Sequence, residues 1–114
     1  MRRLLPLCVV AVVLAGPGGA QAPDCVATVV DVRPLAQYDH AAGRGFLAVR
    51  SGAGSEHTQI GELYLGDRAE VLDRSGSWIF VSCLEGRCTE PLWGPPYPEG
   101  WSFARYLRLE GRCP

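Results

Sequence analysis

The sequence predicts a small all-β domain, a barrel or a sandwich of about five to seven short strands. Short runs rich in β-branched and aromatic residues follow one another along the chain. Glycine and proline separate these runs, as expected at tight turns. After the first 22 residues, no apolar pattern of useful length has the period of a helix, and no internal repeat is present. Short strands in this arrangement form small barrels or sandwiches.

The first strand is expected at residues 25–32, a compact β-branched run. Pro34 follows it and ends it, because proline cannot donate a hydrogen bond to a β-ladder. In the second run, Leu47 and Val49 alternate with their neighbours and are expected to point inward. The later strands are expected at residues 46–50, 59–63, 69–74, 78–83, 101–104 and 107–109.

Turn residues mark the connections between these strands. Gly52 and Gly54 are expected to supply the positive φ that a sharp reversal needs. A loop is expected at residues 35–45, and a hairpin turn at residues 75–77. Residues 104–106 are expected to form a single 3₁₀ turn.

The remaining core and the longest connection follow from the same patterns. Ile60 and Leu63 are expected to continue the core. Residues 89–100 contain four prolines, which exclude a central strand and favour an extended, polyproline-like loop.

The first 22 residues have the organisation of a signal peptide. Two arginines precede an apolar run at residues 4–15, and residues 20–22 have the small-x-small pattern of a signal peptidase site. Cleavage after Ala22 would leave residues 23–114 as a periplasmic or secreted domain. The alternative is an uncleaved membrane anchor, but the apolar run is shorter than the roughly 20 residues that a spanning helix needs.

The charge of the expected mature chain disfavours two classes of partner. Without the two leading arginines, 11 − 2 = 9 basic residues remain, all of them arginine, beside 12 acidic residues. No run of like charge is present. Nucleic acid and anionic membranes both require a basic face, so neither is expected as the main partner.

Four cysteines follow the signal peptide, and an even number in an exported domain predicts two disulfides. Cys83 and Cys88 flank a short turn that contains glycine, so we expect them to pair. Cys25 and Cys113 would then join the two ends of the domain. Loop-closure entropy assigns about 2 kcal/mol to the short loop and about 4.5 kcal/mol to the long one. A zinc site is the alternative, but the spacing differs from that of paired zinc knuckles.

Five motifs in the right order resemble the bacterial SH3-like family. The family's N-V-R-x-G-P-G, I-G-x-L, G-D/T-x-V-x-V-L, G-W-x-x-V and G-W-V-x-x-x-Y-L patterns are similar to residues 48–54, 60–63, 66–72, 77–81 and 100–107. The resemblance covers residues 46–109 and implies a small SH3-like barrel that binds a ligand rather than catalysing a reaction.

The chain departs from the family pattern in three places. Ala48 replaces the usual asparagine, and Ala53 replaces the usual proline. The connection between Val81 and Trp101 is much longer than usual, so it inserts a proline-rich loop into the barrel. Arg50 matches the family's signature arginine and is expected to bond to nearby carbonyl groups or to pair with an acid.

No catalytic or metal-binding pattern is apparent. A thiol–histidine dyad needs a free cysteine, and all four cysteines are expected in disulfides. His40 and His57 are interpreted as solvated loop residues. The acidic residues are scattered singly, so no carboxylate pair stands out for glycoside hydrolysis. We expect neither enzymatic activity nor a cofactor or metal.

Aromatic side chains are the better candidates for a binding site, because they offer a large contact area at a low entropy cost. They could form a shelf for a peptide or a glycan. Packing at the ends of the barrel is the alternative, and we favour it for Trp101 and Tyr106. The candidate ligand-binding residues are Tyr64, Trp78, Trp93, Tyr97, Trp101 and Tyr106.

The resemblance implies a non-catalytic binding module of the cell envelope, with a cell-wall peptide, peptidoglycan or a periplasmic protein as its partner. A secreted inhibitor or protective partner of an extracytoplasmic enzyme is the alternative, because a rigid proline-rich loop can bind without a large ordering cost. A small hydrolase is the least favoured hypothesis.

Overall fold

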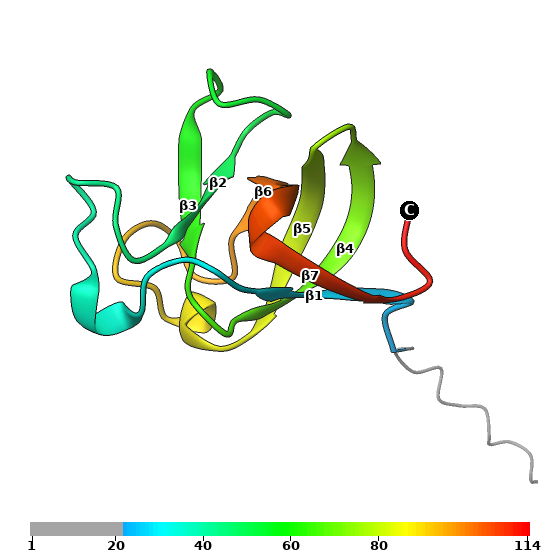
Figure 1. Cartoon of the computed structure of the whole chain (residues 1–114), viewed down its shortest axis with the longest axis horizontal. Helices are drawn as coiled ribbons and strands as arrows, with labels where there is room; N and C mark the ends of the chain where they lie inside the picture. Colours follow the sequence, from blue (N-terminus) through cyan, green and yellow to red (C-terminus); the bar gives the residue numbers. More distant parts are fainter. Residues whose placement is uncertain (1–21) are drawn as a thin grey trace, which may run out of the picture.

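The computed structural model describes residues 22–114, in which seven strands form one antiparallel sheet that curls on itself (Figure 1). The order of the strands is β3-β2-β6-β5-β4-β1-β7. The all-β prediction of five to seven short strands is therefore confirmed. Apart from Ala22, the predicted signal peptide lies outside the described residues.

The strands lie close to their predicted positions. The strands are β1 (Cys25–Val29), β2 (Leu47–Arg50), β3 (Gln59–Leu63), β4 (Arg68–Ser75), β5 (Trp78–Glu85), β6 (Glu99–Phe103) and β7 (Leu107–Gly111). Three short 3₁₀ turns accompany them: η2 (Leu35–Gln37), η3 (Arg87–Thr89) and η4 (Ala104–Tyr106). The predicted 3₁₀ turn is η4. Strand β1 ends earlier than predicted, and Asp31, two residues after its end, has a left-handed backbone with φ 63°.

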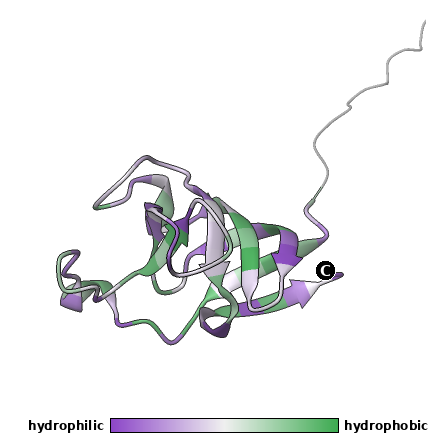
Figure 2. Ribbon diagram, turned by 90° about the horizontal axis from the view of Figure 1, so that it is seen from above, coloured by the Kyte–Doolittle hydropathy of each residue, from purple (hydrophilic) through white to green (hydrophobic). Residues whose placement is uncertain are grey.

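Alternating residues of the strands point into the core, and apolar and polar segments alternate along the ribbon in Figure 2. Leu47 and Val49 are 5% and 0% exposed, as predicted. Leu63 is fully buried, but Ile60 is 37% exposed, so its assignment to the core is wrong. Pairing Val49 with Gly61 sets the inward positions of β3, and Ile60 falls on the opposite face.

Both predicted disulfides are present. Cys25 pairs with Cys113, with their Cα atoms 4.9 Å apart, and joins the start of β1 to the end of the chain. Cys83 pairs with Cys88 and closes the turn between β5 and η3. Three of these four cysteines are buried in the core, so the disulfides also contribute to packing.

The explanation predicted for two glycines is wrong. Neither Gly52 nor Gly54 has a positive φ. A Cβ on Gly52 would lie 2.7 Å from the His57 imidazole, and one on Gly54 would lie 2.5 Å from the Glu56 carboxylate. The turn therefore needs glycine because neighbouring side chains fold over it. In the predicted hairpin between β4 and β5, by contrast, Gly76 has φ 60°.

The proline-rich loop is irregular, as predicted, but it is not a continuous polyproline helix. Gly94 and Tyr97 have φ values of 86° and 52°, which turn the chain back on itself. Hydrogen bonds attach the end of the loop to the short disulfide-closed turn: Tyr97 N–H donates to the Cys88 carbonyl at 3.0 Å, and Cys83 N–H donates to the Pro98 carbonyl at 3.0 Å.

Candidate functional site

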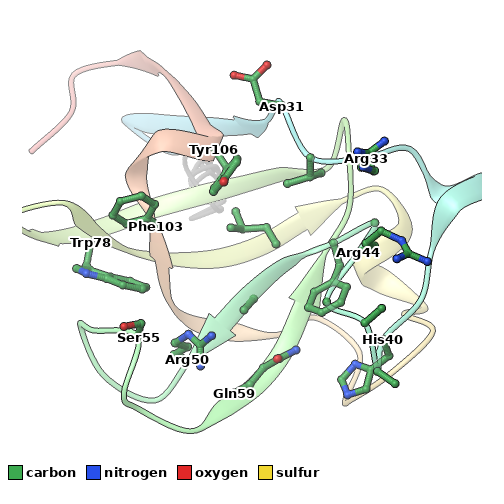
Figure 3. A pocket seen from close by; sticks show the side chains of 18 of the residues that line it. Asp31, Arg33, His40, Arg44, Arg50, Ser55, Gln59, Trp78, Phe103 and Tyr106 are labelled. Carbon is green, nitrogen blue, oxygen red and sulfur yellow. The ribbon is translucent and has the colours of Figure 1, made fainter.

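An open groove of about 950 Å³ crosses one face of the barrel (Figure 3). It lies between the turn at residues 51–58, the loop at residues 31–46 and the beginning of β5 with the end of β6. Trp78, Phe103 and Tyr106 lie on one side of it in Figure 3.

Strand register explains why the aromatic side chains meet. Trp78 in β5 and Phe103 in β6 are directly paired, so both point to the same outer face, with ring centroids 5.3 Å apart. Turn η4 then brings the Tyr106 ring to 6.3 Å from Phe103. The Arg105 guanidinium lies over the Tyr106 ring, with Cζ 5.1 Å from the ring centroid, which is a cation–π distance. These contacts produce an apolar wall with polar groups at its margins.

The opposite side of the groove places the polar groups of Arg50 and Gln59 next to the apolar side chains of Phe46 and Ala48. Arg50 Nη1 donates to the His57 carbonyl at 2.9 Å, which confirms the expected bond to a nearby carbonyl. Arg50 therefore fixes the turn at residues 51–58 while lining the groove. Gln59, its partner across β2 and β3, lines the same side of the groove.

Charges of both signs surround the groove. Arg33 and Arg44 line it together with Arg50, and Asp31 and Glu56 supply two acids. Several of these groups already have partners: Arg44 is 3.5 Å from Asp39, and Asp31 is 3.9 Å from Arg105. The groove thus combines an apolar wall with several polar groups able to orient a ligand.

Two of the six predicted aromatic candidates, Trp78 and Tyr106, line this groove. Trp101 lies outside it, in the next row of the sheet, with its ring centroid 5.3 Å from that of Phe80. Phe103 lines the groove but was absent from the predicted set. Phe103 lies two residues after Trp101 on the predicted strand, so both side chains point to the same face of the sheet. This spacing could have added Phe103 to the candidates. The other three candidates lie at or near the proline-rich loop: Tyr64, Trp93 and Tyr97.

A buried carboxylate organises that second region. Glu62 is 0% exposed and accepts hydrogen bonds at Oε1 from the Tyr38 hydroxyl at 2.9 Å and the Tyr64 hydroxyl at 2.6 Å. His40 Nδ1 lies 2.6 Å from Glu62 Oε2, and its ring stacks on Trp93 with a centroid distance of 4.4 Å. The interpretation of His40 as a solvated loop residue is therefore wrong.

This cluster connects the proline-rich loop to the barrel. The Tyr64 hydroxyl accepts a hydrogen bond from Leu92 N–H at 2.9 Å while it donates to Glu62. Burial, together with the hydrogen bond to Glu62, raises the pKa of Tyr38 to about 12. Burial likewise raises the pKa of Tyr64 above its ordinary value. Both hydroxyls therefore keep their protons and act as donors.

A second buried carboxylate, Asp67, holds the start of η3. It accepts hydrogen bonds from the backbone N–H groups of Tyr64, Arg87 and Cys88 at 2.8, 2.7 and 3.0 Å. Burial raises the pKa of its carboxyl.

Within residues 22–114, no group of three or more histidine, cysteine or acidic side chains is placed to hold a metal ion. Through their hydrogen bonds, Asp67 holds the start of η3 and Glu62, by way of Tyr64, holds the proline-rich loop.

The sequence profile of the bacterial SH3 domain matches residues 45–108, more than half of the chain. The chain belongs to the bacterial SH3 domain family. The predicted family and the SH3-like fold are confirmed, and domains of this family are in general non-catalytic binding modules. No curated protein and no solved structure matches the chain. Across the described part of this SH3 domain, no helix is long and apolar enough to cross a membrane.

Proposed function

We propose that this SH3 domain is an exported, non-catalytic module that holds an extended peptide in the groove beside Trp78. The observation that carries the proposal is the aromatic wall of Trp78, Phe103 and Tyr106 facing the polar groups of Arg50 and Gln59. Aromatic rings supply contact area at a low entropy cost, and the polar groups can bond to peptide carbonyls or side chains.

The dimensions and charge of the groove favour a short peptide over a nucleic acid. Its volume of about 950 Å³ is within the range of small-ligand sites, and the groove is open to solvent. The three arginines that line it are accompanied by two acids, so it lacks the uniformly basic face that a phosphate backbone requires.

The cell envelope is the proposed setting. Two disulfides favour an oxidising compartment, and the first 22 residues have the sequence pattern of a signal peptide. The proposed ligand is therefore the peptide of the cell wall or an extended segment of a periplasmic protein.

Retention on purified peptidoglycan, compared with capture from a periplasmic extract, tests this proposal. Trp78→Leu and Phe103→Leu should each weaken retention about tenfold, because each removes one ring of the aromatic wall. Phe80→Leu is the matched control, since Phe80 is a half-buried aromatic residue in the neighbouring row that does not line the groove. Equal losses in all three variants would contradict a site in the groove.

A second candidate function rests on the proline-rich loop. Leu92, Trp93 and Tyr97 are 45%, 37% and 59% exposed on a loop that the Cys83–Cys88 disulfide and the Glu62 cluster hold in place. A constrained loop with exposed apolar side chains can inhibit or protect an extracytoplasmic enzyme at a low ordering cost. Capture of such an enzyme that is lost in Trp93→Ala and Tyr97→Ala would support this function. Retention on peptidoglycan without any protein partner would contradict it.

A further inference from the structure

The two edges of the sheet differ in how they are covered. At the β3 edge, the proline-rich loop packs so closely that a Cβ on Gly61 would lie 2.5 Å from Pro98. The other edge is β7, which follows β1 along the front of the molecule in Figure 1. Within residues 22–114, β7 pairs with β1 alone and has no strand on its other side.

The register between β1 and β7 shows which backbone groups face this open edge. Val30 N–H donates to the Tyr106 carbonyl, and Arg112 N–H donates to the Asp24 carbonyl, at the two ends of the pairing. Hydrogen-bonded pairs alternate along an antiparallel ladder. The backbone N–H and C=O groups of residues 108 and 110 therefore also face β1. The N–H and C=O of Leu109 therefore point away from β1, and no strand of the described residues pairs with β7 on that side.

The side chains on either side of Leu109 carry opposite charges. Arg108 and Glu110 are both exposed and lie on the outer face of β7, opposite Thr28 and Val26 of β1. Neither takes part in an ion pair among residues 22–114. This short segment is self-complementary, because reversing its direction places an arginine opposite a glutamate at both positions.

We propose that β7 pairs antiparallel with β7 of a second copy of this chain, about a two-fold axis at Leu109. Leu109 would then exchange two N–H···O=C hydrogen bonds with Leu109 of the second copy. Arg108 would face Glu110 of the second copy, and Glu110 would face its Arg108. These charged pairs occupy the positions between hydrogen-bonded pairs, where the side chains of antiparallel strands approach most closely.

The same register also gives a hydrogen-bond partner to the backbone groups at the two ends of β7. Leu107 N–H already donates to the Ala104 carbonyl within η4, so only the Leu107 carbonyl is available to a second strand. In the proposed pairing, that carbonyl faces Gly111 of the second copy, which can donate its N–H. A dimer formed this way covers the open edge, which a free strand otherwise exposes to non-specific pairing.

Exchanging the charges of Arg108 and Glu110 tests the proposal. Sedimentation equilibrium of the purified protein measures the dissociation constant of the dimer. The wild type should form dimers with a dissociation constant below about 1 mM, as expected for a small interface. Arg108→Glu and Glu110→Arg should each weaken association at least about tenfold, because two attractive pairs become repulsive. The double variant restores both pairs and should return to within about threefold of the wild type.

Arg74→Glu is the matched control, since it makes the same charge change at the end of β4, away from the edge. It should leave the dissociation constant within about threefold of the wild-type value. A wild-type protein that stays monomeric up to 1 mM would overturn the proposal. A double variant as weak as the single variants would overturn the proposed register.

Amide hydrogen exchange followed by NMR gives a residue-level readout. Exchange at Leu109 should slow at least about tenfold between dilute and concentrated samples, because its N–H is bonded only in the dimer. Exchange at Arg108 and Glu110, which bond to β1 within one copy, should change much less. Concentration-independent exchange at Leu109 would contradict pairing through β7.

Discussion

Replacing Tyr64 by phenylalanine tests whether the buried cluster holds the proline-rich loop on the barrel. Tyr64 is 1% exposed, so the change removes one oxygen and leaves the packing of the ring in place. Two hydrogen bonds disappear: the 2.6 Å bond to Glu62 and the 2.9 Å bond from Leu92 N–H. A bond to a charged acceptor contributes about 1.5–3 kcal/mol and a neutral one about 0.5–1.5 kcal/mol, so the expected loss of stability is about 2–4.5 kcal/mol.

Chemical denaturation at neutral pH with both disulfides intact measures this loss. Tyr38→Phe is the matched control, because its half-buried hydroxyl makes a single 2.9 Å bond to Glu62 that water can replace. We expect the free energy of unfolding to fall by only about 1 kcal/mol in that variant. The reasoning is refuted if Tyr64→Phe changes the stability by less than about 0.5 kcal/mol, or by less than Tyr38→Phe does.

Three further predictions concern titration, packing and the disulfides. The phenol of Tyr38, with a pKa of about 12 in the folded protein, should stabilise the fold fully below pH 10, with that contribution lost as the pH rises through about 12. Ultraviolet titration should therefore show a late tyrosine step, and a single step near pH 10 would contradict the prediction. Gly100→Ala should lower the stability by about 1–3 kcal/mol, because its Cβ would lie 2.6 Å from a backbone oxygen of β2. Gly54→Ala should cost less in the same denaturation assay, since the Glu56 side chain can move aside. Replacing Cys83 and Cys88 by serine should lower the stability by about 2 kcal/mol, and removing the disulfide that joins β1 to the C-terminus should lower it by about 4.5 kcal/mol. The reverse order would contradict the loop-entropy argument.

The strands and disulfides could be predicted because their signals are local. Alternation along residues 46–50 placed Leu47 and Val49 in the core, and the five-residue spacing of Cys83 and Cys88 indicated a closed turn. A local pattern is less reliable where register decides the outcome. Ile60 is apolar, but the pairing of β2 with β3 places it on the outer face.

The Glu62 cluster could not be predicted in the same way. His40 and Glu62 are 22 residues apart, and they meet only because the loop after η2 and the proline-rich loop both cover the outer face of β3. A single glutamate in a strand carries no signal that distinguishes a buried position from a solvated one. The groove was partly predictable: Trp78 and Tyr106 were candidates, but their meeting with Phe103 depends on the register of β5 and β6.

Backbone NMR titration with peptides released from purified peptidoglycan tests the central claim most directly. If the groove binds an extended peptide, amide shift changes should gather at residues 50–59, at Trp78 and at residues 103–106. The same changes should be lost in Trp78→Leu and kept in Phe80→Leu. Shift changes confined to the proline-rich loop at residues 89–98, or equal changes in both variants, would contradict binding in the groove.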